Sequence, residues 1–346
     1  MAYTTINKST DNFNTKLYTG NGGTQSLTGV GFQPDWVWIK RRDSSGSHII
    51  TDAVRGTGKI ISSDGNGAEF NEGSNGVSAF GTDGFSIGNL SSINTNSGTF
   101  ASWNWKAGTT GSGTTTGSGS YKTYSYSVNT TAGFSIIKYK GNGTNGHQIP
   151  HHLGTTPSMT IIKITSGSDN WIVQSANRGW DKRLILDTTN VEAAHTDFVT
   201  GVSSTTLTLQ TNGSVNGNDA DYIAYVFAEK TGYSKFGSYT GNGSHPDGNF
   251  IYTGFKPSWF MVKNVSANGH SWYIVDNKID PDNPTNKYLV ADTSAAEAAF
   301  DWFDLNSNGI KIRGNSGGAN SGGDSYFYMA FGQSLVGSNN VPCTAR

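Results

Sequence analysis

The sequence has few charges, one cysteine and no long apolar run. Charged residues make up 14% of its 346 residues, against roughly 25% in average proteins. No basic block occurs and the net charge is −1, which argues against nucleic-acid binding. No apolar run approaches the ~18 residues of a transmembrane helix, so we expect no membrane insertion. The single cysteine, Cys343, excludes an internal disulfide.

Glycine and aromatic residues are abundant instead. The chain contains 46 glycines, and 12% of its residues are aromatic. Serine, threonine and asparagine are also frequent. This composition is typical of turn-rich β structure with a polar, weakly charged surface. Stability must then come from packing, and a homo-oligomer is one way to add to it.

One phrase occurs three times and indicates an internal repeat. The copies are GFQPDWVWIK at 31–40, GTTPSMTIIK at 154–163 and GFKPSWFMVK at 254–263. Each predicts a strand that is buried on both faces. In the first copy, Trp36 and Trp38 would point to one side, and Val37 and Ile39 to the other. We expect the terminal lysine of each copy to lie where the strand reaches water.

Three further features recur in the same order. A tyrosine precedes a Gly-Asn-Gly turn at 18–22, 139–143 and 239–243. A lysine, an aspartate and a glutamate then follow at intervals of five residues, at 59–69, 182–192 and 287–297. Aromatic strands close the copies at 100–105, 222–227 and 326–331. The three copies are nearly equal in length.

These patterns predict an all-β protein of three tandem β-sandwich repeats, jelly-roll or lectin-like, each with one short helix. The expected boundaries are 1–107, 121–230 and 231–337, followed by a polar C-terminal tail at 338–346. Residues 108–120 are only glycine, serine and threonine, a composition that predicts a flexible linker. We therefore expect the first repeat to be tethered, and the second and third to dock directly.

The recurring carboxylates allow two interpretations. Paired acids suit glycoside hydrolysis. Glu69, Glu192 and Glu297 also fit a capping box, in which the glutamate bonds the first amide of a helix. The capping interpretation predicts a helix near 295–303. We favour it because an enzyme rarely keeps three copies of a catalytic pair.

Two groups of residues could bind a metal. His147 and His151 cluster with His152, but no cysteine or carboxylate is near them, so an exposed loop is the simpler interpretation. Asp280 and Asp282 offer oxygen ligands that suit Ca²⁺, without the spacing of a known calcium loop. We expect no metal and no cofactor, with the two aspartates as the alternative metal ligands.

A glycan could bind at Trp180. This tryptophan has no aromatic counterpart in the other copies, and Arg178 and Asp181 flank it. An indole ring can stack on a sugar while polar neighbours bond its hydroxyls. With Trp180, Arg178 and Asp181, the histidines His147 and His151 complete the candidate binding residues. No catalytic residue is assigned. Specificity should lie in the loops that differ between copies, at 143–154, 176–183 and 277–286.

The chain resembles repeat-containing virion structural proteins of tailed phages, notably marine and cyanobacterial ones. The resemblance rests on residues 31–40 and on NTKLYTGNG at 14–22, WNWKAG at 103–108 and GYSKFGSYTGNG at 232–243. It covers nearly the whole chain. It implies a non-enzymatic virion protein, assembled in the host cytoplasm, that acts as a tail fibre with lectin-like recognition of the host surface.

The resemblance leaves two alternatives. One is a capsid decoration protein, such as a cement or head-fibre protein. The other is a glycan-degrading tailspike, which would normally show a long β-helix and an acidic pair confined to one repeat. The implied partners are other virion proteins, further copies of the chain in a trimer, and a host surface glycan.

Overall fold

The computed structural model describes residues 3–336, and this part of the chain is all β. Its strands pair antiparallel, and its described residues contain two α-helices of four residues each. The all-β prediction is confirmed. Cys343 and the predicted tail at 338–346 lie outside the described residues. Below, the first, second and third units are residues 3–107, 109–227 and 234–333.

The first unit consists of two larger sheets and one short pair of strands. One sheet has the order β1 (Phe13–Thr19), β9 (Thr99–Trp105), β3 (Trp36–Arg41), β4 (Ile49–Asp52). The other has the order β2 (Gln25–Thr28), β8 (Gly84–Ile87), β7 (Val77–Gly81). The remaining elements are β5 (Lys59–Ile60), which pairs with β6 (Phe70–Asn71), helix α1 (Ser91–Asn94), and 3₁₀ turns at Ser9–Asp11 and Gly73–Asn75.

The second unit repeats this order and adds strands at the edges. Its larger sheet runs β10 (Thr109–Thr114), β12 (Thr123–Asn129), β13 (Phe134–Lys140), β21 (Asp221–Phe227), β15 (Met159–Ile164), β16 (Ile172–Ser175), β17 (Gly179–Ile185), β18 (Ala193–Ala194). The smaller runs β11 (Thr116–Gly117), β14 (His147–Pro150), β20 (Thr206–Leu209), β19 (Val199–Val202). Helix α2 is Gly213–Asn216.

The third unit joins both sets of strands into one sheet. Its order is β22 (Ser234–Thr240), β29 (Ser325–Gln333), β24 (Lys256–Asn264), β25 (Trp272–Asp276), β26 (Thr285–Val290), β27 (Ala298–Asn306), β28 (Gly309–Ile312), β23 (Phe250–Tyr252). The same four-strand order thus occurs three times, as β1-β9-β3-β4, β13-β21-β15-β16 and β22-β29-β24-β25. We call these four-strand sets the inner sheets.

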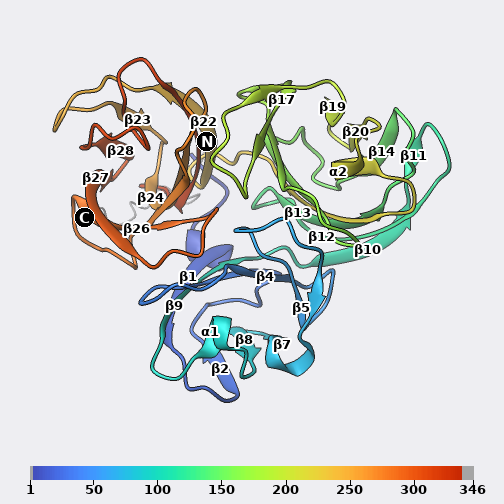
Figure 1. The fold of residues 1–346 in the computed structure, drawn as a ribbon, viewed down its shortest axis with the longest axis horizontal. Coiled ribbons are helices and arrows are strands. Elements are labelled where there is room, and N and C mark those ends of the chain that lie inside the picture. Colours follow the sequence, from blue (N-terminus) through green and yellow to red (C-terminus); the bar gives the residue numbers. More distant parts are fainter. Residues whose placement is uncertain (1–2, 337–346) are drawn as a thin grey trace.

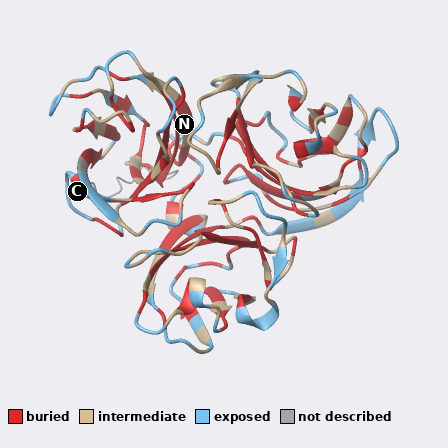
Figure 2. Ribbon diagram, viewed as in Figure 1, coloured by how far each residue is buried: buried red, intermediate tan, exposed pale blue. Residues whose placement is uncertain are grey.

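The inner sheets meet at the centre of the molecule. Figure 1 shows three lobes around a common centre, with the first unit at the bottom and the second and third at the upper right and upper left. One continuous hydrophobic cluster joins side chains of all three units. Figure 2 shows that the strands facing this centre are almost entirely buried. Three further clusters fill the interior of each unit separately.

The repeated strand is buried on both faces, as predicted. Trp36 and Trp38 lie in the central cluster, whereas Val37 and Ile39 lie in the interior of the first unit. The Trp36 ring stacks on Tyr225 of the second unit, with ring centroids 4.4 Å apart. The period of two in strand side chains explains this alternation. The first unit is therefore not merely tethered, because its inner sheet shares a core with both others.

Equivalent hydrogen bonds close the three units into a ring. Trp171 of the second unit donates its indole N–H to Ser62 O of the first, at 2.9 Å. Trp272 of the third unit donates to Ile185 O of the second, also at 2.9 Å. His48 of the first unit lies at the matching position, with its Nε2 2.8 Å from Val290 O of the third. The pattern is cyclic and forms a pseudo-threefold arrangement within one chain.

Residues 109–114 and 116–117 form strands, so the prediction of a flexible linker at 108–120 was wrong. Strand β10 pairs with β12 along its whole length, and β11 pairs with β14. A Cβ at Gly111 would lie 2.6 Å from the Tyr126 hydroxyl, so glycine leaves room for a ring that crosses the strand. The missing side chain of this glycine therefore makes room for a neighbouring ring, and does not make the segment flexible.

The predicted helix near 295–303 was also wrong. This segment lies mostly in strand β27, which pairs with β26 and β28. Its Phe303 and Leu305 alternate into the interior of the third unit, the period of a strand. The two short helices lie elsewhere, each just before the last strand of its unit. Asn94 at the end of α1 accepts the amide of Asn21 through its Oδ1, which holds the Gly-Asn-Gly turn.

Candidate functional site

The repeated lysines lie in the seams between units. Lys40, Lys163 and Lys263 are fully buried, so the prediction that they reach water was wrong. Each Nζ donates to backbone carbonyls of its own unit and of a neighbouring unit. For Lys163 these are Ile164 O at 2.8 Å and Asn66 O at 3.2 Å. Burial lowers the pKa of each of the three lysines to about 8.

The repeated aspartates hold the start of a strand in their own unit. Asp64, Asp187 and Asp292 each accept, through Oδ1, a backbone N–H at 2.9 Å. The donors stand at the start of the fourth inner strand or one residue before it: His48, Trp171 and Trp272. Burial raises the pKa of all three carboxyls. These aspartates are structural anchors.

The repeated glutamates form ion pairs, so the capping interpretation was wrong. Each glutamate side chain bonds an arginine and approaches the lysine ten residues before it. The pairs are Glu69 with Arg55 and Lys59, Glu192 with Arg178 and Lys182, and Glu297 with Arg42 and Lys287. Each glutamate amide also donates to a carbonyl of the neighbouring unit. Of the three spaced residues, the glutamate therefore contributes to the seams, through its backbone amide.

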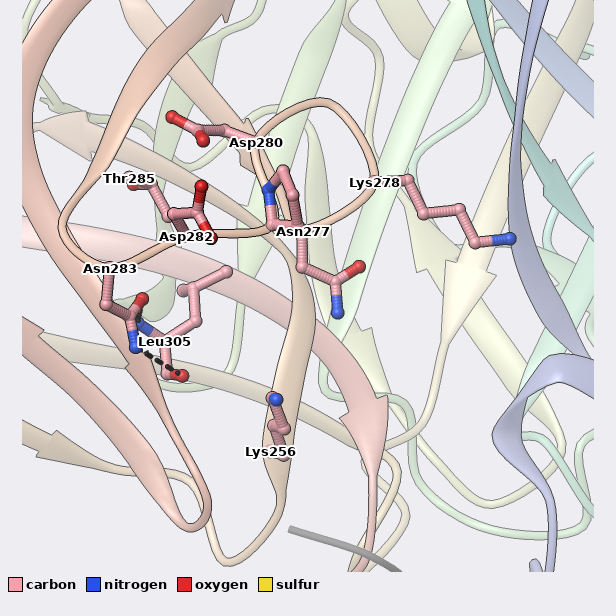
Figure 3. A pocket seen from close by; sticks show the side chains of 9 residues that line it. Lys256, Asn277, Lys278, Asp280, Asp282, Asn283, Thr285 and Leu305 are labelled. Carbon is pink, nitrogen blue, oxygen red and sulfur yellow. Dashed lines mark hydrogen bonds between the residues drawn. The ribbon is translucent and has the colours of Figure 1, made fainter. Parts of the chain in front are cut away.

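The variable loop at 277–286 lines a polar cavity of about 480 Å³. Lys256 and Leu305 complete its wall (Figure 3). Asn283 is fixed by two hydrogen bonds to the backbone of Leu305, at 2.9 and 3.3 Å. Lys278 extends away from the cavity to Asn14 Oδ1 and Thr15 O of β1 (Figure 3). The loop is thus anchored to the first unit while Asn277, Asp282 and Asn283 line the cavity.

Two polar side chains of this cavity are accessible to a ligand, whereas Thr285 belongs to its buried wall and is 1% exposed. Asp282 is exposed. Asn277 is half-buried and also lines the cavity. A cavity of this size with convergent polar groups suits a small polar ligand.

One of the two aspartates of this loop is engaged with the loop backbone. Asp280 is buried, and its Oδ2 accepts the amides of Asn286 at 2.6 Å and Lys287 at 3.2 Å. These bonds close the loop. Among residues 3–336 no group of three or more histidine, cysteine, aspartate or glutamate side chains is placed to hold a metal ion. The same finding covers His147, His151 and His152.

The predicted sugar platform at Trp180 is only partly open. Trp180 lies in β17, half-buried against the interior of the second unit. Arg178 is engaged with Glu192, with its Nε 2.6 Å from Oε2. Asp181 is exposed. Within the described contacts, none joins these three residues to His147 or His151.

The two candidate histidines are buried supports. His147 bonds Asn216 Oδ1 at 2.9 Å and Thr115 Oγ1 at 2.7 Å, and so holds the segment that carries β10 and β11. His151 bonds Ser203 O at 3.2 Å. Burial lowers the pKa of both imidazoles, which keeps them neutral. The expectation of an exposed histidine loop was therefore wrong for both.

Sequence reasoning missed Lys256 as a lining residue. It stands at the variable position of the phrase Gly-Phe-x-Pro, where the first unit has Gln33. A charge at the one position that differs inside a repeated phrase is a signal that could have been used.

These features define an all-β protein whose three units close into a ring around one core. The chain belongs to the family described as a domain of unknown function, DUF7483, whose model matches residues 8–334. This match spans all three units and the segments between them. No curated protein and no solved structure matches the chain. In the described residues no helix has the length and apolar character needed to cross a bilayer.

Proposed function

We propose that the protein is a non-enzymatic virion structural protein, a tail fibre or similar appendage that recognises the host surface. The observation that carries the proposal is a division of labour between residues. The charged residues shared by the units bond one another and the backbone of the scaffold, whereas the loop at 277–286, which differs between units, lines a polar cavity. A repeated scaffold with a cavity lined by a loop that differs between units suits recognition better than repeated catalysis.

The fold supports recognition of a lectin-like kind. We interpret each unit as a β-sandwich with a jelly-roll or lectin-like arrangement, because apolar layers lie on both sides of each inner sheet. The unit boundaries at 107, 120, 230 and 337 remain part of this proposal. Such modules bind by surface shape, hydrogen bonds and aromatic contacts.

A capsid decoration protein is the second candidate. The pseudo-threefold ring favours it, since three equivalent units can match a surface with threefold symmetry. In both candidates the partners are other virion proteins. A homotrimer would place three such rings together, with a host surface glycan as the external ligand of the appendage.

Adsorption separates these candidates. Purified protein from an appendage should adsorb to host cells and block infection, and Asn277→Ala with Asp282→Ala should weaken adsorption. Asp11→Ala with Asn96→Ala, exposed residues of the first unit, is the matched control. Protein that ignores cells but binds stripped capsids would establish the decoration role. Release of reducing sugar from host polysaccharide would overturn both in favour of a tailspike enzyme.

A further inference from the structure

The outer face of β23 carries two aromatic side chains that the other units lack. Phe250 and Tyr252 are 47% and 59% exposed, while Ile251 between them points inward. The cross-strand register identifies the equivalent positions, which hold small or polar residues: Ser26 and Thr28 in the first unit, Gln148 and Pro150 in the second. Exposed aromatics confined to one of three equivalent sites point to a function of that site.

A groove of about 430 Å³ lies between β22 and β23. Its lining is uncharged: Ser238, Tyr239, Asn249, Phe250, Ile251, Tyr252 and Tyr328. The Phe250 ring lies within 2.6 Å of where a Cβ on Gly309 would stand, so the missing side chain lets the ring lie along β28. The opposite ring face is left to solvent.

Two polar groups of the groove have unused hydrogen-bonding capacity. Tyr328 is 3% exposed, and no hydrogen bond to its hydroxyl occurs in the described part of the chain. The neighbouring Tyr239, by contrast, donates to Ala319 O at 2.6 Å. Asn249 donates its amide to Thr240 O. The Asn249 Oδ1 has no partner among the described contacts and can accept.

The equivalent gap in the second unit is filled by the chain itself. There β12 pairs with the outer edge of β13, and β11 pairs with β14. In the third unit the described strands leave the outer edges of β22 and β23 unpaired. Only this unit therefore combines an open gap with exposed aromatics.

We propose that this groove binds a neutral glycan. Phe250 and Tyr252 would stack on the apolar faces of sugar rings, while the Tyr328 hydroxyl and Asn249 bond their hydroxyls. The uncharged lining matches a neutral ligand. A peptide added as a strand along β22 or β23, which have seven and three residues, is the competing occupant; the exposed aromatic rings and the uncharged lining favour the glycan. The site itself stands on the groove, and only the source of the glycan, the host surface, rests on the proposed function.

The test uses the whole chain and a panel of neutral oligosaccharides of two to four hexose or N-acetylhexosamine units. The wild-type protein should bind at least one of them, and calorimetric titration gives the dissociation constant. Phe250→Ser with Tyr252→Thr, which copies the first unit, should weaken binding at least about tenfold. Tyr328→Phe, which removes only the hydroxyl, should weaken it about fivefold. Phe70→Ser, at an aromatic of the first unit that is 61% exposed, should leave binding unchanged.

Salt and particle measurements complete the test. Because the groove is uncharged, the affinity should change less than about twofold between low and high salt. Binding that survives the double substitution, or a wild type that binds only extended peptides, overturns the inference. Protein found on virions that binds no neutral glycan also overturns it and leaves the proposed function standing. Glycan binding by a protein that is absent from virions would support the groove as a glycan site and overturn the proposed function.

Discussion

At the scale of single residues, the three buried lysines replace water with backbone carbonyls from two units. Lys40 donates to Gly46 O at 2.9 Å in its own unit and to Ser294 O at 3.1 Å in the third. A buried ammonium that makes no direct ion pair is stable only when its N–H donors are satisfied in this way. Its depressed pKa gives the seams a dependence on pH.

Lys163→Met tests this dependence. The folded-state pKa of Lys163 is about 8, below its ordinary value of 10.5. Between these pH values the unfolded chain retains a proton that the folded chain has lost, so the contribution of Lys163 to the free energy of unfolding rises with pH. The unfolding free energy measured from pH 7.5 to 9.5 should therefore rise more steeply in the wild type than in Lys163→Met. Lys8→Met, at a lysine that is 65% exposed, should keep the wild-type slope. Equal slopes for all three proteins would contradict the assignment.

Glu297→Gln tests the seam between the third and first units. Glu297 lies 2.6 Å from Arg42, and both side chains are 16% exposed. Removing one charge leaves the arginine without its partner, so we expect a loss of about 1–2 kcal/mol in unfolding free energy. Asp11→Asn, in a pair that is more than half exposed, should cost under about 0.5 kcal/mol. Denaturant titration measures both, and a smaller loss for Glu297→Gln than for Asp11→Asn would argue against the pair.

At the scale of elements, the sequence predicted strands better than it predicted their partners. The alternation of Trp36, Val37, Trp38 and Ile39 was enough to assign a strand buried on both faces. The recurrence of Glu69, Glu192 and Glu297 was also evident, but their partners lie on other strands or other units, which spacing within one repeat cannot show. Residues 108–120 failed for a related reason, since their glycines are required by rings of β12.

Gly111→Val tests this role of glycine. The added side chain would collide with the Tyr126 ring, which is also held by stacking on His152 at 3.7 Å. We expect β10 to separate from β12, with amide hydrogen exchange at 109–114 at least about tenfold faster. Ser112→Val, on the opposite face of the same strand, is the matched control and should retain slow exchange. Fast exchange of this segment in the wild type would restore the flexible linker.

The sequence predicted one loop of the candidate site, but it did not predict which side chains are accessible there. The loop at 277–286 was identified because it differs between repeats, and it does line a cavity. Trp180 and His147 were chosen by residue type, and burial decided against an open site at either. Phe250 and Tyr252 escaped notice because their positions become equivalent to Ser26 and Thr28 only through the strand register.

At the scale of the whole molecule, the shared core predicts that the units unfold together. Trp105 is 1% exposed, and its ring contacts Phe13 and Trp36 of the first unit and Trp259 and Phe331 of the third. A side chain that joins two units couples their stabilities.

Trp105→Ala should lower the unfolding free energy by about 3–5 kcal/mol. In scanning calorimetry one transition should shift as a whole, because no unit can keep its inner face buried alone. Phe70→Ala, at an exposed ring, should leave the transition within about 0.5 kcal/mol of the wild type. Two separated transitions in the variant would show that the units are independent.

The three units form a closed ring, so none of them is structurally the first. The seam between the first and third units is made without a covalent link: Ser9 donates its amide to Gln333 Oε1 at 2.7 Å, and Gln333 donates to Asn7 O at 3.2 Å. The contacts that hold the units together therefore do not depend on which residue is the N-terminus. Joining the chain near Asn7 to the chain near Gln333, and reopening it between the second and third units, would produce a circular permutant with the same neighbours. The order of the three units in the gene is therefore one of three cyclic permutations that would give the same arrangement of units.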